Sequence, residues 1–257
     1  MASRGNAFAL RYSRLDPEAR VGLPSGRFTN PSAITSMIVG AVGMGAVYGV
    51  TYLFRDREIG AVVWQYLTGF SGIPIPMAAL ASWAIAILLI KSLKISAQRR
   101  SLGLRFVPSD PGFTLGASTV GRAIAAIEDA VDEPERFMYL SRVLRALRSV
   151  RNVGRAAEID EMLRSQADAD EAVMEGGYTL VRGFIWAIPV LGFIGTIVGL
   201  TQAIGKFGGV LSQRSGEIQE LTQRLTEVIQ GLDTAFVTTG EGLVAALVIH
   251  LLQTFVR

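Results

Sequence analysis

The sequence contains no cysteine and a single histidine, His250. The missing thiols exclude disulfides, thiolate nucleophiles, cysteine-ligated zinc and iron–sulfur clusters, and one histidine cannot build a histidine-based metal cluster within the chain. A GxSxG nucleophile elbow and a Walker-type phosphate loop are also missing. We therefore expect no enzymatic activity, no metal site and no cofactor.

The chain also lacks a large excess of positive or negative charge. The 25 Lys and Arg residues almost balance the 22 Asp and Glu residues, which leaves a net charge of +3. The basic residues are spread over several segments and do not alternate with aromatic residues, so nucleic acid is not an expected partner. Hydrophobic residues, in contrast, make up 50% of the chain and gather in long blocks. Such blocks are typical of an integral membrane protein that contacts the lipid bilayer.

Four of these blocks reach the roughly 20 residues that a helix needs to cross a bilayer. They cover about 33–54, 74–93, 180–204 and 228–256. The sequence therefore predicts an all-α integral membrane protein with four transmembrane helices. We divide it into an N-terminal tail (1–32), a first transmembrane hairpin (33–93), a helical insert (94–179) and a second hairpin (180–257).

The orientation in the membrane is predicted from the run KSLKISAQRRSLGLR, residues 91–105, which is strongly basic and directly follows the second block. By the positive-inside rule this run is cytoplasmic, and both chain ends and the insert are then cytoplasmic too. The segment 59–72 lies on the outer side. Its aromatic residues Trp64, Tyr66 and Phe70 indicate an interfacial segment, because aromatic side chains favour the headgroup level.

Within the insert, Pro108, Pro111 and Gly112 predict a loop, and apolar residues recur at helical spacing after it. We favour a set of amphipathic cytoplasmic helices over a separate catalytic domain. Acidic and basic residues are closely balanced here, so the charged faces are expected to be solvated or paired between subunits.

The third block contains IPVLGFIGTIVGLTQAI, residues 188–204. Gly192, Gly195 and Gly199 follow one another at spacings of three and four, which places them on one side of a helix where small residues permit close packing. Thr196 extends this surface. It is either a packing threonine, with its hydroxyl bonded to its own backbone, or part of an ion pathway.

The fourth block carries a polar stripe. Thr234, Thr238 and Glu241 are spaced by four and three, Thr239 lies on the adjacent flank, and Asp233 lies near the outer end. A carboxylate in the middle of a bilayer costs roughly 2.5–3.5 kcal/mol, so the stripe is expected to face a bundle interior, a partner helix or a narrow wet pore. Glu241 then belongs either to an ion pathway or to a neutral structural contact.

The two blocks together resemble the MotA/TolQ/ExbB proton-channel family. IPVLGFIGTIVGL is followed about thirty residues later by GLDTAFVTTGEGL, and the resemblance covers about 180–256. It does not select one branch of the family. We assign Pro189, Gly192, Gly195, Gly199 and Gly242 to helix packing. The matching positions are Pro189, Leu191, Gly192, Gly195, Thr196 and Gly199 in the first helix and Gly231, Leu232, Ala235, Phe236, Thr239, Gly242 and Leu243 in the second.

The resemblance implies a function. Family members form pentameric rings in the bacterial inner membrane around a pore lined by the last two helices. A dimeric single-span partner of the MotB/TolR/ExbD type inserts into that pore, and each partner helix carries an essential aspartate. Ion flow, here expected to be of protons with sodium as the alternative, moves the partner. Thr196 and Thr239 match the two pore threonines of the family.

The carboxylates depart from the family pattern. In the ExbB/TolQ branch a glutamate occurs where this chain has Thr234, and Asp233 beside it is turned by about 100° on a helix. Glu241 has no counterpart in the family pattern. We predict an ion pathway that consists of Thr196, Asp233, Thr234, Thr238, Thr239 and Glu241. A non-conducting pentameric scaffold, or a subunit that senses the envelope, is the alternative function.

Overall fold

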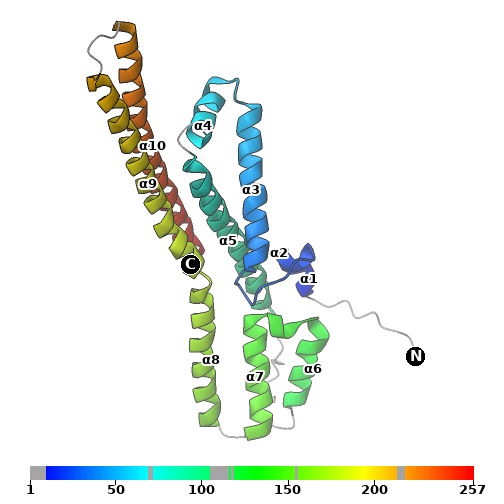
Figure 1. Cartoon of the computed structure of the whole chain (residues 1–257). Helices are drawn as coiled ribbons and strands as arrows, with labels where there is room; N and C mark the ends of the chain where they lie inside the picture. Colours follow the sequence, from blue (N-terminus) through cyan, green and yellow to red (C-terminus); the bar gives the residue numbers. More distant parts are fainter. Residues whose placement is uncertain (1–9, 69–71, 105–115, 117–118, 154–155, 213–217) are drawn as a thin grey trace. The chain divides into compact units, whose positions relative to one another are not determined.

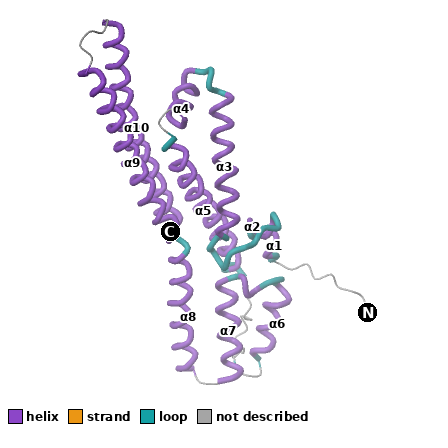
Figure 2. The backbone as a smooth tube through the Cα atoms, viewed as in Figure 1, coloured by secondary structure: helices purple, strands orange, loops and turns teal. Residues whose placement is uncertain are grey.

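The computed structural model describes residues 10–68, 72–104, 116, 119–153, 156–212 and 218–257. Over these residues the chain is helical, apart from loops and one isolated bridge between Leu10 and Val131 (Figure 2). It forms two compact units. The first comprises Met1–Ser36 and Leu89–Thr179, and the second comprises Met37–Leu88 and Leu180–Arg257. The predicted loop at Pro108, Pro111 and Gly112 lies outside the described residues.

Among the residues that the structure describes, four helices are long and apolar enough to cross a membrane. They are α3 (Ala33–Leu53), α5 (Pro74–Ser101), α9 (Thr179–Ser212) and α10 (Ile218–Val256) (Figure 1). This confirms the prediction of an all-helical chain with four helices able to span a bilayer. Many large apolar side chains on these helices are exposed in the single chain, among them Phe193, Ile194 and Phe236, as expected where lipid or other helices cover them.

In the second unit, α4 (Glu58–Thr68) folds back beside α3. Trp64 on α4 meets Tyr48 and Tyr52 on α3 edge to face, with ring centroids 6.4 and 5.5 Å apart. The Tyr48 hydroxyl donates to the carbonyl of Leu67 at 3.2 Å. Trp64 of the predicted interfacial segment therefore holds α4 against α3, whereas Phe70 lies outside the described residues.

The first unit contains the short helices α1 (Tyr12–Leu15) and α2 (Pro17–Arg20), then α6 (Val120–Ala130), the 3₁₀ turn η1 (Pro134–Arg136), α7 (Met138–Val153) and α8 (Ala156–Gly176). The apolar faces of α6 and α7 pack on each other because their apolar residues recur at helical spacing. The shared core consists of Val120, Ala123, Ile124, Ile127, Leu144 and Leu147.

The described part of the predicted N-terminal tail, residues 10–32, is a folded element. Asp16 begins α2 by accepting bonds from the backbone N–H groups of Glu18 and Ala19, at 2.8 and 3.0 Å, and Pro17 occupies the first helical position. Lys94 on α5 then pairs with Asp16 at 3.0 Å and with Glu18 at 2.6 Å. All three charged side chains are almost fully buried.

Further bonds complete this buried network. The Glu18 carboxylate accepts from the backbone N–H groups of Gly26 and Ser32, and Asp16 accepts from the Tyr12 hydroxyl at 2.5 Å. Burial and the bond to Asp16 raise the pKa of Tyr12 to about 12. Burial alone would raise the pKa of Asp16, but the bonds from Tyr12 and Ala19 and the charge of Lys94 lower it overall.

A second buried lysine ties the N-terminal segment to the end of α8. Lys91 donates to Asn30 Oδ1 at 2.9 Å and to the carbonyl of Met174 at 3.0 Å, and it lies 4.0 Å from the ring centroid of Tyr178. Asn30 in turn donates to the carbonyl of Val173 at 2.7 Å. Two lysines of the predicted basic run are thus engaged within the protein.

Candidate functional site

Helices α9 and α10 lie side by side (Figure 1), and the glycines between them bring the two backbones into contact. A methyl group built on Gly192 would lie 2.7 Å from the carbonyl oxygen of Thr238, and one built on Gly199 would lie 2.5 Å from that of Gly231. A methyl group on Gly195 would overlap the side chain of Thr238. Only glycine fits at these positions, because any side chain would push the two helices apart.

The other predicted packing residues lie on the same interface. A methyl group on Gly242 would lie 3.1 Å from the carbonyl oxygen of Ile188 and 3.4 Å from Cα of Pro189. Pro189 lies inside α9, which continues through it to Ser212. The small residues of both helices therefore form one continuous contact along the hairpin.

Thr196 and Thr239 meet across this contact. The Thr196 hydroxyl donates to the carbonyl of Ala235 at 3.0 Å, and the Thr239 hydroxyl donates to the carbonyl of Gly192 at 3.1 Å. The two hydroxyl oxygens also form a short hydrogen bond with each other. Both side chains are half-buried, so the pair reaches the surface of the hairpin.

The hydroxyl pair has more acceptors than protons. Each hydroxyl carries one proton and two lone pairs, while the pair faces two backbone carbonyls besides its own mutual contact. The three hydrogen bonds cannot all be made at once with two protons. The pair can therefore switch its donor direction by rotating a hydroxyl, and it can accept a bond from a water, an ion or a partner group at the exposed flank.

The neighbouring polar residues are placed differently. Thr238 is fully buried, and its hydroxyl donates to the carbonyl of Thr234 at 2.8 Å. Thr234 donates to the carbonyl of Gln230 at 2.9 Å. Both hydroxyls are thus satisfied within α10. Asp233 is exposed and forms no ion pair with another described residue.

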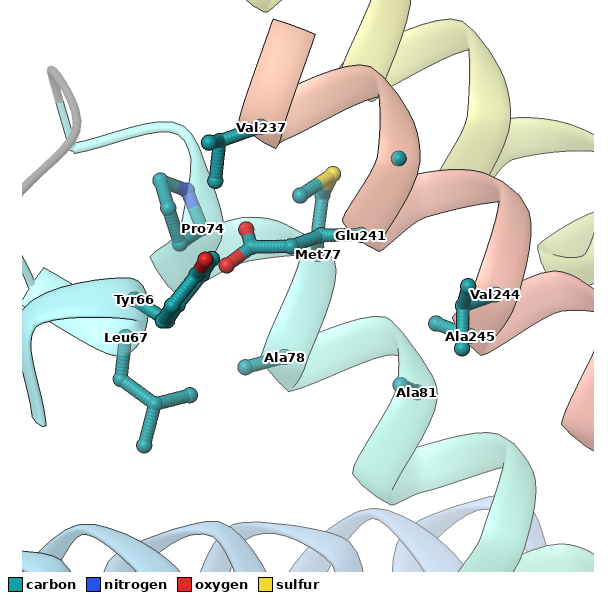
Figure 3. Close-up of a pocket in the computed structure, with 11 residues that line it drawn as sticks. Tyr66, Leu67, Pro74, Met77, Ala78, Ala81, Val237, Glu241, Val244 and Ala245 are labelled. Carbon is teal, nitrogen blue, oxygen red and sulfur yellow. The ribbon is translucent and has the colours of Figure 1, made fainter. Parts of the chain in front are cut away.

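Glu241 lies in a pocket of about 530 Å³ in the second unit. Figure 3 shows its carboxylate pointing toward Tyr66 of α4 and Pro74 of α5. The rest of the lining is mostly apolar and comes from α4, α5 and α10, with Leu67, Met77, Ala78, Ala81, Val237, Gly240, Val244 and Ala245.

The structure brings Thr196 and Thr239 together and keeps Glu241 apart from them. Residues 239 and 241 are two positions apart, which corresponds to about 200° on a helix. Thr239 faces α9 on one flank of α10, and Glu241 faces the α4–α5 side on the other. The predicted polar stripe therefore divides into a hydroxyl pair and a separate acidic pocket.

The pocket partners of Glu241 were not identified from the sequence. Tyr66 and Met77 reach it from α4 and α5, more than 160 positions earlier in the chain. A sequence pattern within one helix cannot predict such a contact, because the contact depends on how the helices of the two hairpins pack. Within the part of the chain that the structure describes, no group of three or more acidic or histidine side chains could hold a metal ion.

These features define a multi-pass membrane protein whose last two helices pack through small residues and join two hydroxyls across the contact. The sequence model of the MotA/TolQ/ExbB proton channel family matches residues 132–257, and through this region the chain belongs to that family. The match includes α7, α8, α9 and α10. Membership identifies an ion-channel type of membrane subunit, in a family of channels rather than enzymes. No curated protein and no solved structure matches the chain.

Proposed function

We propose that this protein is the ring-forming subunit of an ion-driven motor in the bacterial inner membrane. Five copies surround a pore, and ion flow through it moves a dimeric single-span partner whose helices each carry a membrane aspartate. The transported ion is a proton. The observation that carries the proposal is the hydroxyl pair of Thr196 and Thr239, which is held between two closely packed helices and still reaches the surface of the hairpin.

The pair suits proton transfer at an interface with a partner. A hydroxyl relays a proton when its oxygen accepts one proton while its own proton passes to the next acceptor, and rotation of the hydroxyl then resets it without net charge on the helix. The partner's aspartate supplies the titratable group, and the threonines supply the hydrogen bonds that orient it. Thr234, Thr238 and Asp233 lie on α10 on the outer side of the pair. Glu241 lies in the separate pocket on the α4–α5 side, and we assign it a structural contact there, the second of the two roles that the sequence allows.

The orientation follows from the basic residues after the second span. With these residues inside, both chain ends and the first unit are cytoplasmic, and the loop between α9 and α10 is outside. A chain that moves a partner does so without covalent chemistry, so no cofactor is required.

The test begins with the composition of the native complex. The tagged chain, purified from native membranes in mild detergent, should give a native mass of five copies with two copies of a single-span protein that has an aspartate in its span. The complex is then placed in liposomes with a pH-sensitive dye inside, and proton uptake is measured under an applied voltage.

Thr196→Val is the informative variant, because it removes the hydroxyl at nearly constant volume. Loss of one hydrogen bond in the pathway should lower proton uptake roughly tenfold or more. Thr201→Val is the matched control, since Thr201 is exposed on the same helix and, among the described residues, donates to the carbonyl of Ile197 at 2.7 Å. Wild-type uptake no greater than that of protein-free liposomes, in an intact complex, favours the non-conducting scaffold, whereas full uptake by Thr196→Val excludes the hydroxyl pair as the pathway. A monomeric wild-type chain contradicts the ring.

A further inference from the structure

Helix α8 has two faces of different character. One face lines a cleft of about 360 Å³ in the first unit, which we call the basic cleft, formed by Arg27, Arg145, Met162, Gln166, Asp170 and Val173 together with smaller side chains. Asp170 is buried and paired with Arg142 at 2.8 Å, so its charge is neutralised within the protein. The floor of the cleft is therefore neutral and partly apolar.

The rim of the basic cleft is positive. Arg145 on α7 and Arg27 in the N-terminal segment are both exposed, and neither forms an ion pair with another described residue. The guanidinium carbon of Arg27 lies 4.9 Å from the ring centroid of Phe28. Two arginines beside a partly apolar floor suit an acidic amphipathic surface.

The opposite face of α8 supplies such a surface. Glu161, Asp168 and Glu171 are exposed, and we call this surface the acidic ridge. Ala172 is exposed next to Glu171, and the exposed Arg164 on the same side is paired with Asp160 at 3.0 Å, which leaves the ridge acidic on balance. Asp168 lies two positions from Gln166, and Glu171 lies two positions from Ala169, which is about 200° around the helix in each case. Asp168 and Glu171 therefore point away from the centre of the basic cleft of the same chain, and Glu161, one position from Met162, lies on its flank.

Positive charge beside one face of α8 and negative charge on another face fit a head-to-tail contact between copies. A face-to-face dimer would bring ridge against ridge or cleft against cleft, and like charges would repel. A head-to-tail contact places each ridge in the next cleft and, when the rotation closes, it makes a ring.

We propose that the acidic ridge of α8 docks into the basic cleft of the neighbouring copy. This interface rests on the ring that the proposed function requires, and it names the contact that joins the subunits outside the membrane. In a closed ring all copies lie at one height, so contacts join residues at similar levels. Arg145 and Asp170 line the cleft together, and Asp168 lies half a turn from Asp170, which makes Arg145 and Asp168 partners across the interface.

Disulfide trapping tests the contact directly, since the chain has no cysteine of its own. The full chain with Arg145→Cys and Asp168→Cys should form disulfide-linked multimers when native membranes are oxidised. Each single variant should stay monomeric on a denaturing gel, because a head-to-tail contact never brings identical residues together. Absence of multimers in the double variant, or strong dimers from a single variant, overturns the proposal.

Charge reversal is the second test. Arg27→Glu with Arg145→Glu should weaken the purified ring about tenfold, judged from the concentration at which it dissociates in native mass spectrometry. Asp168→Arg with Glu171→Arg should do the same, and all four changes in one chain should restore the ring. Arg14→Glu with Arg20→Glu is the matched control, because these arginines are exposed in the same unit and line neither surface.

The outcomes separate this interface from the proposed function. Rings of undiminished stability in both reversed variants overturn the interface and leave the motor proposal in place. A wild-type chain that is monomeric in the same detergent overturns the ring itself. Binding of pyrophosphate that depends on Arg27 and Arg145, with no change in assembly, shows a site for a small anion and overturns the docking.

Discussion

The two units differ in how far the hydrogen-bonding capacity of their buried polar groups is satisfied within the chain. In the first unit, Lys94, Asp16 and Glu18 are almost fully buried, and each forms ion pairs and hydrogen bonds that satisfy it within the chain. In the second unit, Thr196 and Thr239 are half-buried and have more acceptors than protons. A saturated network holds a structure in place, whereas an unsaturated one keeps capacity for an external group.

This difference distinguishes buried polar side chains that stabilise the fold from those that are available for ion passage. The carboxylates of the first unit are charged and paired, so their removal is expected to act on folding. The hydroxyls of the second unit are neutral and inexpensive to bury, so their removal is expected to act on ion passage while the fold survives. The following changes test the comparison, from the largest expected effect to the smallest.

Lys94→Met should have the largest effect on stability. It keeps the length of the side chain and removes the charge that neutralises Asp16 and Glu18, which leaves two carboxylates buried without a counter-ion. Breaking a buried pair in this way costs about 3–5 kcal/mol. We expect little folded protein in the membrane and a sharply lower melting temperature in detergent. The variant Lys94→Met with Asp16→Asn and Glu18→Gln should recover part of the loss, and a stable single variant would show that water reaches the network.

Gly195→Ala should have the next effect. The added methyl overlaps the side chain of Thr238, so α9 and α10 must separate, at a cost of about 1–3 kcal/mol. The measurement is the thermal stability of the purified chain in detergent. Gly205→Ala on the same helix is the control, because a methyl there meets open space and alanine favours a helix. Equal melting temperatures for the two variants would contradict the close packing.

Alkaline pH should destabilise the first unit through Tyr12. Its pKa is raised to about 12 in the folded chain, whereas an unfolded tyrosine titrates near pH 10. Its contribution is therefore complete below about pH 10 and is lost as the pH rises toward 12. Tyr12→Phe should be less stable at neutral pH and should lack this alkaline step. The measurement is the free energy of unfolding from chemical denaturation at about pH 8 to 12. Parallel curves for both proteins would exclude Tyr12 as the cause.

Low pH should destabilise the same network through Asp16. The pKa of Asp16 is lowered in the folded chain, so its contribution is present above the pKa of an unfolded aspartate, about 3.9, and is lost as the pH falls through the lower folded value. Asp16→Asn should flatten the acid limb of the stability curve. An unchanged acid limb would assign the acid sensitivity to other carboxylates.

Glu241→Gln should have the smallest effect. Glutamine keeps the shape and the hydrogen-bonding capacity of a neutral glutamate, and the pocket lies on the opposite flank of α10 from the hydroxyl pair. We expect proton uptake within about twofold of wild type and a normal ring, while Glu241→Leu perturbs the pocket further. A relay role instead predicts that both variants abolish uptake with the ring intact. The liposome assay used for Thr196→Val distinguishes these outcomes.

The sequence by itself determined the class of protein and the helices that carry the chemistry. Apolar blocks of sufficient length specify transmembrane helices, because a bilayer leaves the backbone few other ways to satisfy its hydrogen bonds. The glycines at helical spacing indicated a packing surface, and the threonine positions on the two helices led to the family that the match over residues 132–257 shows. All of these signals are local, since they depend on spacing along one helix.

Only the tertiary structure decided which polar residues meet. Helical spacing placed Glu241 on a face with Thr234 and Thr238, but the packing of α10 against α9 and α5 divides that face between two environments. The polar N-terminal segment gave no sign that Asp16 and Glu18 pair with Lys94, although Asp16 followed by Pro17 is a helix-start signal. Contacts between residues far apart in the chain depend on how helices pack, and spacing along a single helix carries no information about its partner.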